Sequence, residues 1–335
     1  MACASYGSTS GVSIFYAVDA DDAAAIGATI TWNEVPFTSD SLAGNLTTAQ
    51  SERITAARAY AGSAIVSGEV SGSLGFESEA SPFMDAMLKA VLQSADAFAS
   101  DGDTITNGET AGCFMFLKRV KNGAGYDYYI FRGVQIDSMS LSVSPGSLIS
   151  GEIALQGVRM GAGALGATDG SNDTLTTIPV GWTLTPYTSG NIMSSVYDLR
   201  SFEIQDDTGS DIGVVAREIT LTMSNQLRQQ QGVGTGSPYA AGVASGRFMC
   251  TLDADAYYSG PTIIDALQND SSLKASFGLV DATGNGWTFL ADYLKVTDGP
   301  PPQADGPDQD LIASSSFQAF QSAAHGTIEI AKVVA

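Results

Sequence analysis

The segment WNEVPFTSDSL, Trp32–Leu42, reappears in altered form as WTLTPYTSGNI, Trp182–Ile192. Both segments read Trp, three residues, Pro, an aromatic residue, Thr and Ser. Tryptophan occurs three times in 335 residues, so chance is a poor explanation for two matched segments. The repetition predicts an internal duplication, with two related units following each other along the chain.

Further segments recur in the same order, although less closely. The pairs are SGSLGFESE (71–79) with SGRFMCTLDAD (245–255), SPFMDAMLKAVLQSADAF (81–98) with PTIIDALQND (261–270), YDYYIFRGVQIDSMSLSV (126–143) with GWTFLADYLKV (286–296), and LISGEIALQGV (148–158) with LIASSSFQAF (311–320). A conserved order with drifting spacing is what a diverged tandem duplication predicts, with the length differences placed in loops.

This organisation predicts four parts of the chain. They are an N-terminal arm at 1–30, a first unit at 31–160, a Gly/Ala/Asp-rich linker at 161–180 and a second unit at 181–335. Each unit is large enough to bury its own core. The stretch GAGALGATDGSN (161–172) consists of small and turn-forming residues, as expected between compact units.

Apolar and small polar residues alternate in many segments, for example ITLTMS (219–224) and SMSLSV (138–143). A period of two indicates β-strands with one buried face. Around Gly133 the alternation of apolar and polar residues shifts by one position, which predicts a β-bulge. Turn dipeptides predict hairpins at Asn122-Gly123, Asn285-Gly286 and Asp101-Gly102.

One segment favours a helix instead. Ser81 followed by Pro82 is typical of a helix start, and an apolar stripe follows it. The stripe consists of Phe83, Met84, Met87, Leu88, Val91, Leu92 and Ala95. A shorter copy is expected from Ile263 to Leu267, after Pro261. The predicted fold is therefore mainly β, with each unit an antiparallel sandwich or partial barrel flanked by one helix.

The chain is strongly acidic, with 36 acidic and 15 basic residues and a net charge of −21. Such a field repels nucleic acid and anionic membranes, although it is compatible with a surface past which DNA slides, or with solubility alone. No segment approaches the ~20 apolar residues of a membrane span. The N-terminus lacks the features of a signal peptide, so synthesis and folding in a cytoplasm are expected.

Motifs that resemble ligand sites have simpler interpretations. Gly161, Gly163 and Gly166 match a dinucleotide-binding pattern, but no helix start follows them, which favours a linker. The stretch from Asp281 to Asp292 resembles a calcium loop in rhythm, but Thr283 and Asp292 replace required ligands, so a hairpin turn is favoured. DDTGSD (206–211) is interpreted in the same way.

The remaining chemical groups do not form a predicted active site. His325 is the only histidine and lies in a polar turn, without a nucleophile motif of the G-x-S-x-G kind. Cys3, Cys113 and Cys250 have no metal-ligand spacing, and the last two are expected in the core. Acidic runs are expected to be solvated loops. These runs are DADD (19–22), DGD (101–103), DAD (253–255) and ADGPDQD (304–310).

We therefore predict no catalytic, cofactor-binding or metal-binding residues. The cations of LKRVK (117–121) are expected at an exposed strand end or in ion pairs with an acidic neighbour. The residues of the repeated motif are expected in the core or at a subunit contact; they are Trp32, Pro36, Trp182 and Pro186.

The succession of these segments resembles phage tail tube proteins, and most closely the two-copy tube proteins of long, non-contractile tails. The resemblance rests on WNEVPFTSDSL, VSGEVSGSLGFE, MDAMLKAVLQS, YYIFRGVQIDSMSLSVSPGSLISGEIALQGVRM, PYTS, REITLTMSNQL and SSSFQAFQSAAHGTIEI. It covers nearly the whole chain after about residue 15.

The resemblance implies a structural virion protein that is not an enzyme and needs no cofactor. Subunits of the family join edge to edge into rings around a β-barrel, and the rings stack into a hollow tube for the genome. A duplicated unit would let three chains build a pseudo-sixfold ring. The implied partners are further copies of the chain and the tape measure, tail tip and tail terminator proteins. DNA would pass the acidic bore without specific binding, and no membrane is involved.

The resemblance also indicates candidate ring-to-ring contacts. These are the arm at 1–30, the loop from Asn225 to Ser245 and the insertion GPPPQADGPDQD (299–310). Three alternatives stay open: a tube or terminator protein of a contractile tail, a carbohydrate-binding β-sandwich adhesin, and an acidic hydrolase with paired carboxylates.

Overall fold

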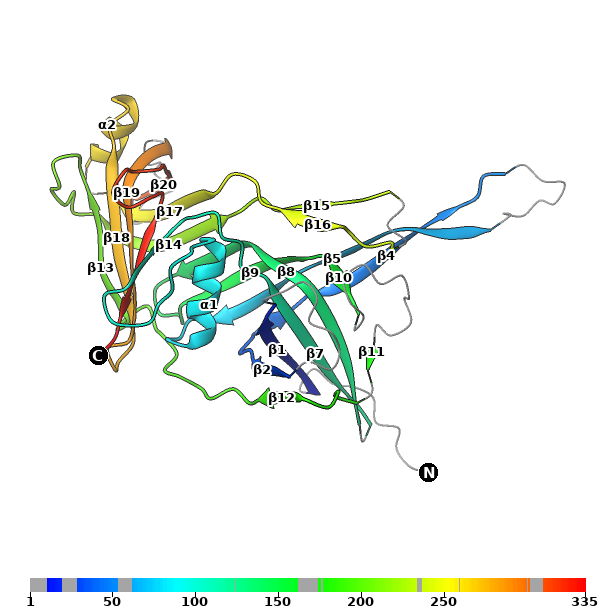
Figure 1. Ribbon diagram of the computed structural model, residues 1–335. Helices are drawn as coiled ribbons and strands as arrows, with labels where there is room; N and C mark the ends of the chain where they lie inside the picture. The colour runs from blue at the N-terminus through cyan, green and yellow to red at the C-terminus, as the bar shows by residue number, and fades with distance from the viewer. Residues whose placement is uncertain are drawn as a thin grey trace.

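The computed structural model describes residues 11–19, 29–53, 62–123, 125–161, 174–175, 177–233, 237–258, 260–299, 301 and 310–335. Within these ranges the chain is mainly β-strand, with two helices, as the sequence predicts (Figure 1). The elements of the first half are β1 Val12–Val18, β2 Ile30–Glu34, β3 Ser39–Asp40, β4 Ala43–Gln50, β5 Ser63–Glu77, α1 Pro82–Val91, β6 Thr104–Thr106, β7 Phe114–Asn122, β8 Gly125–Val143, β9 Ser150–Gly157 and β10 Arg159–Met160.

The second half continues with a similar set of elements. They are β11 Thr174–Leu175, β12 Trp182–Thr185, β13 Leu199–Gln205, β14 Val215–Ser224, β15 Arg228–Gln230, β16 Gly242–Ala244, β17 Met249–Tyr257, α2 Thr262–Gln268, β18 Leu273–Val280, β19 Gly286–Asp298, β20 Ile312–Ala319 and β21 Glu329–Val333.

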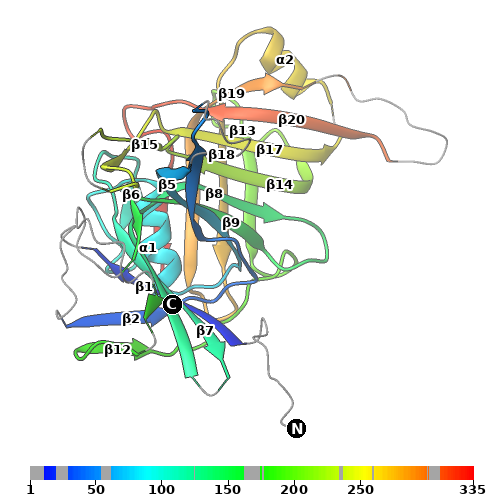
Figure 2. The same cartoon turned by 90° about the vertical axis from the view of Figure 1, so that its right-hand side faces the viewer.

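One antiparallel layer runs through both halves, and we call it the central sheet. Its strand order is β4, β5, β9, β8, β14, β17, β20 and the end of β19, with β3 beside β4 along β5. Figure 2 shows β20, β17, β14, β8 and β9 as successive neighbours. The described strands of the central sheet do not close into a barrel.

Flanking strands pair with the long strands outside the central sheet. The first part of β8 pairs with β7, which pairs with β1, and β1 also pairs with β2. In the second half the first part of β19 pairs with β18 and β21, and these pair with β13 and β6. The long strands β8 and β19 therefore run from the flanking strands into the central sheet, and the two layers enclose the core.

The strand pairings of the two halves follow one order. In the first half the neighbours are β1, β7, β8, β9, β5 and β4, and in the second they are β13, β18, β19, β20, β17 and β14. Each helix occupies the same place, since α1 follows β5 and α2 follows β17.

Irregularities of the strands also recur at matching places. The hairpins β7–β8 and β18–β19 shift register at Phe114/Phe116 and Leu273/Ala275, while β8–β9 and β19–β20 shift at Ile136/Ser138 and Val296/Asp298. The first irregularity lies beside Gly133, which has a φ of 60°. The bulge predicted around Gly133 is thus confirmed.

The core lies between the apolar face of the central sheet, the flanking strands and α1. In β14, Ile219, Leu221 and Met223 are buried while the intervening Thr and Ser side chains are half-buried on the other face. One cluster of buried residues includes Ile14 of the first half and Ile330 of the second. The two halves thus share core packing in this structure.

Helix α1 begins as predicted. The Ser81 Oγ accepts a hydrogen bond from the Met84 N–H at 3.3 Å, and Pro82 occupies the first turn. The helix ends at Val91, and Gln93 takes a φ of 49°. Ala95 is therefore outside the helix and exposed, contrary to the predicted stripe. The shorter α2 after Pro261 is confirmed.

Two of the three predicted hairpin turns are confirmed. Asn122-Gly123 joins β7 to β8, and Asn285-Gly286 closes the turn between β18 and β19. Asp101-Gly102 forms a turn, but it lies between α1 and β6 and not between paired strands. Its backbone is held instead by the C-terminal strand, because the Gly102 N–H donates to the Lys332 carbonyl at 2.9 Å.

The predicted arm and linker are only partly within the described residues. Residues 12–18 are not a surface arm, because β1 pairs along its length with β7 and buries Ile14 and Phe15. The rest of the predicted arm, residues 1–10 and 20–28, lies outside the described residues. So do residues 162–173 of the linker, including Gly163 and Gly166, and most of the insertion at 299–310.

Candidate functional site

The central sheet carries a polar face that is formed by regular strands of both halves. Ser140 lies opposite Glu152 on β9 and Thr222 on β14, and Thr222 lies opposite Thr251 on β17. Alternation places these side chains on one face because successive residues of a strand point to opposite sides. The result is a wall of short hydroxyl side chains that crosses from the first half into the second.

Carboxylates are set among these hydroxyl groups. They are Glu77, Glu152, Glu218, Asp253, Asp255 and Asp298. Asp253 lies opposite Thr220 and Ser316, and the Ser316 hydroxyl donates to its carboxylate. With Glu218, Asp255 and Ser314 it lines a shallow groove of about 360 Å³. The predicted loop DAD (253–255) is therefore strand β17, with Asp253 and Asp255 on the polar face and Ala254 in the core.

The two copies of the repeated motif lie against each other. Strands β2 and β12 pair in parallel, with Trp182 opposite Ile30, and the rings of Trp32 and Trp182 have centroids 5.1 Å apart. Trp32 is fully buried, whereas Trp182 is half-buried at the edge of the same small cluster. The predicted role of Trp32 as a core residue is confirmed.

Polar contacts extend this joint between the motif copies. The Tyr187 N–H donates to Glu34 at 3.1 Å, and the Tyr187 hydroxyl donates to the buried carboxylate of Glu79. Burial and the hydrogen bond to Glu79 raise the pKa of Tyr187 to about 12. The hydroxyl therefore stays protonated and serves as a fixed donor near neutral pH.

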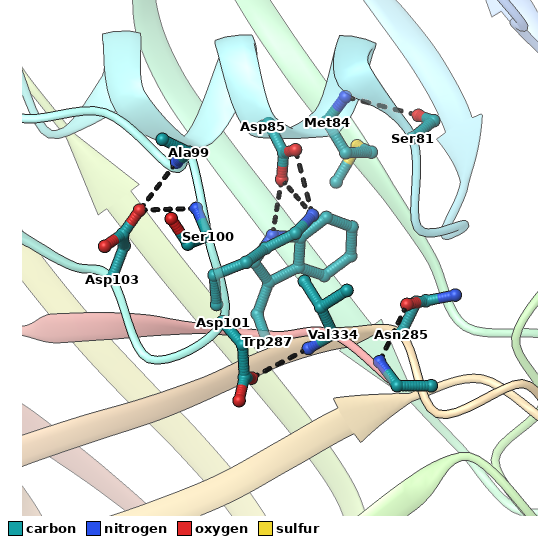
Figure 3. Close-up of polar contacts among 12 residues, drawn as sticks. Ser81, Met84, Asp85, Ala99, Ser100, Asp101, Asp103, Asn285, Trp287 and Val334 are labelled. Carbon is teal, nitrogen blue, oxygen red and sulfur yellow. Dashed lines mark hydrogen bonds and ion pairs between the residues drawn. The ribbon is translucent and has the colours of Figure 1, made fainter.

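A second joint connects α1 with the C-terminal strands (Figure 3). The Asp85 carboxylate accepts the Trp287 Nε1–H at 2.8 Å and forms an ion pair with Lys332 at 2.7 Å. Lys332 Nζ also lies 4.9 Å from the centre of the Trp287 ring. Because Trp287 is fully buried, water cannot reach its indole N–H. Without the Asp85 carboxylate this buried donor would have no hydrogen-bond acceptor. One acidic side chain thus ties the first helix to the second half.

The described residues of the segment from Asn225 to Ser245, which include β15 and β16, lie on the first half of the same chain (Figure 1). The Asn225 amide is buried and donates to the carbonyls of Val91 and Ile136 at 2.9 and 3.0 Å. The Gln229 amide donates to the carbonyls of Val70 and Gly157 at 3.1 and 3.0 Å. This segment, predicted as a ring-to-ring contact, therefore has an intramolecular role among its described residues.

The equivalent segment of the first half contrasts with it. The hairpin of β4 and β5 projects away from the body, and its described residues 46–50 and 62–66 are exposed (Figure 1). It carries Leu46, Ile65 and Val66, which are 45%, 54% and 56% exposed. Exposed apolar side chains on a projecting hairpin are typical of a contact surface.

The motifs that resemble ligand sites are closed turns. Burial raises the pKa of Asp281, but hydrogen bonds from Thr283 and Asn285 outweigh it and leave the pKa below its ordinary value. Hydrogen bonds from Thr208 and Ser210 likewise lower the pKa of Asp206. Both carboxylates accept bonds within their own turns.

The remaining predicted residues have structural surroundings. His325 Nδ1 lies 3.0 Å from a carboxylate oxygen of Glu329, so the histidine of this turn is paired with the first residue of β21. Cys250 is buried, as predicted, and burial raises the pKa of its thiol to about 12, whereas Cys113 is half-buried and lines a cavity near α1. Lys118 of the predicted basic cluster pairs with Asp40.

Within the ranges that the structure describes, His, Cys, Asp and Glu side chains form no group of three that could hold a metal ion. The helices of the same ranges are too short or too polar to cross a membrane.

The fold and its surfaces define a β-rich protein with one long sheet, which the described strands do not close into a barrel, and a polar face that runs through both halves. Residues 4–319 match a family model described as phage tail tube protein. Because the match covers nearly the whole chain, the chain belongs to the phage tail tube family, whose members are structural components of the virion tail. A comparison with curated proteins gave no significant match.

Proposed function

We propose that the chain assembles into stacked rings that form the hollow tube of a phage tail, through which the genome enters the host. The observation that carries this proposal is the open central sheet, which ends in β3 and β4 on one side and β19 on the other. Among the described strands, β3 and β4 pair only with β5. An unpaired strand edge is a hazard for a monomer, whereas ring closure makes it the assembly interface.

We further propose that three chains form each ring, with two duplicated units per chain in a pseudo-sixfold arrangement. The common strand order and the matching irregularities of the two halves support this arrangement. The junction of β8 with β14 supports it as well, because it is already a sheet-to-sheet contact between the halves. A closed ring repeats one heterologous contact until the rotation is complete.

The polar face of the central sheet is proposed as the wall of the bore. Short hydroxyl side chains and carboxylates would hold DNA weakly, because phosphate affinity comes mainly from basic contacts. In this arrangement the chain acts without catalysis, and its partners are further copies of itself and the tape measure, tail tip and tail terminator proteins. It would be made in the host cytoplasm and function in the virion.

Negative-stain electron microscopy of the concentrated, purified chain tests this function. We expect hollow tubes or rings whose end-on averages show pseudo-sixfold symmetry, with a ring mass of three 34.6 kDa chains by light scattering. A protein that stays monomeric at every concentration and salt condition, and also when mixed with preformed tail tips, would contradict the proposal.

A further inference from the structure

The intramolecular contact of the second-half hairpin gives a template for a contact between chains. We call residues 225–233 with 237–245 the second hairpin and residues 45–50 with 62–66 the first hairpin arm. The second hairpin joins β14 to β17, and the first hairpin arm belongs to the β4–β5 hairpin, which has the equivalent place in the strand order. The two hairpins are thus equivalent parts of the two halves.

The second hairpin covers a defined surface of the first half. Gly242 and Val243 line a cavity together with Gly133 and Val158. Val158 is 7% exposed there, and the Gly68 N–H donates to the Pro238 carbonyl at 2.6 Å. The contact therefore combines apolar burial with backbone hydrogen bonds.

The equivalent surface of the second half is partly exposed among the described residues. By the matched pairings and bulges, Gly133 corresponds to Tyr293 and Val158 to Phe320. Tyr293 and Phe320 are 37% and 40% exposed, and their rings lie 5.9 Å apart in a tilted pair. Ile65 and Val66 of the first hairpin arm stay exposed among the residues that the structure describes.

We infer that the first hairpin arm of one chain docks on the Tyr293–Phe320 pair of a second copy, as the second hairpin docks on the first half within the chain. This inference rests on the proposed function. It adds which surface of one chain meets which surface of the next. The free edge of β3 and β4 then lies beside the end of β19, as β14 lies beside β8. Burying Ile65, Val66 and the aromatic pair removes apolar surface from water and stabilises the ring.

The contact is heterologous, because an arm on one chain meets a receptor on the next, and this allows a direct test. The arm variant is I65D/V66D and the receptor variant is F320D. All three side chains are exposed in the single chain, so we expect both variants to fold, with circular dichroism and melting temperatures close to those of the unchanged protein. Val196, which is 64% exposed in a loop of the second half, gives the matched control V196D.

The test is made under conditions in which the unchanged chain forms tubes. Each variant alone should remain monomeric by light scattering, while V196D should form tubes. Mixing the two variants should give a complex with the mass of two chains that grows no further, because only one intact arm meets one intact receptor.

Tubes formed by either variant alone would overturn the inference and leave the proposed function standing. Two monomeric variants that fail to pair on mixing would overturn the assigned partner surfaces. An unchanged chain that forms no ring or tube would instead count against the proposed function itself, and the docking inference would fall with it.

Discussion

Trp32 and Trp182, the first residues of the two repeated segments, pack against each other with ring centroids 5.1 Å apart. The segment that reveals the repeat in the sequence therefore also joins the two halves in space. The parallel pairing of β2 with β12 and the bond from Tyr187 to Glu34 lie in the same joint. The two similar segments are therefore also in direct contact.

Loss of the tryptophan contact should destabilise the chain. W32A removes a fully buried side chain and should lower the free energy of unfolding by about 3–5 kcal/mol. W182A should cost less because Trp182 is half-buried. In urea unfolding experiments a double-mutant cycle should give a coupling of about 0.5–1.5 kcal/mol between the two rings. Y197A, at a tyrosine that is 77% exposed, is the control, and additive effects of W32A and W182A would contradict the contact.

The ion pair between α1 and β21 should contribute to stability. D85N keeps an acceptor for Trp287 but removes the charge facing Lys332, so we expect a loss of about 1–3 kcal/mol in unfolding free energy. D96N changes an exposed carboxylate just after the helix and should have little effect. Equal stabilities for D85N and D96N would show that this ion pair does not hold the halves together.

Cys250 should make the fold sensitive to alkaline pH. Its thiol has a pKa near 12 in the folded chain because of burial, against an ordinary value of 9.0. Above pH 9 the unfolded chain releases this proton and the folded chain keeps it, so the stability from this group is complete below pH 9 and is lost as pH rises toward 12. Urea unfolding at pH 8 and pH 10.5 should show a smaller alkaline loss for C250A than for the unchanged chain. The same pH dependence in both proteins would exclude this cause.

Reversing charges on the polar face should create a bore that retains DNA. We expect E218K/D253K to form tubes that bind short DNA with strong salt dependence, because each basic contact releases a counterion. Bound DNA should resist a nuclease, since the enzyme cannot follow it into the bore. The control E109K/D96K makes the same change of charge at exposed residues outside the central sheet and should leave bound DNA open to digestion. Equal protection of DNA from the nuclease in the two variants would show that the polar face does not line the bore.

Local features of the fold could be predicted because local sequence determines them. The alternation in ITLTMS, the start of α1 at Ser81 and the bulge at Gly133 depend on neighbouring residues alone. The end of α1 could not be placed, because Leu92 and Ala95 continue the apolar pattern beyond it. The carbonyl of Leu92 accepts a hydrogen bond from the Gly108 N–H, a partner from beyond β6 that the local pattern does not indicate.

Contacts between distant residues could not be predicted. Nothing near Asp85 in the sequence indicates Trp287 or Lys332, and Asn225 gives no local sign of its bonds to Val91 and Ile136. Sequence similarity also aligns one pair of segments from the two halves differently from the strand pairing. Sequence similarity pairs the segments that begin at Ser71 and Ser245, whereas strand pairing makes Gly72 equivalent to Leu252, since they lie opposite Leu155 and Phe317.

The most direct test of the central claim is a cryo-electron microscopy map of tubes assembled from the purified chain, at a resolution that separates strands. We predict rings of three chains with Ser140, Thr222 and Asp253 on the wall of the bore. A solid filament, or a tube that carries these three residues on its outer surface, would contradict the account.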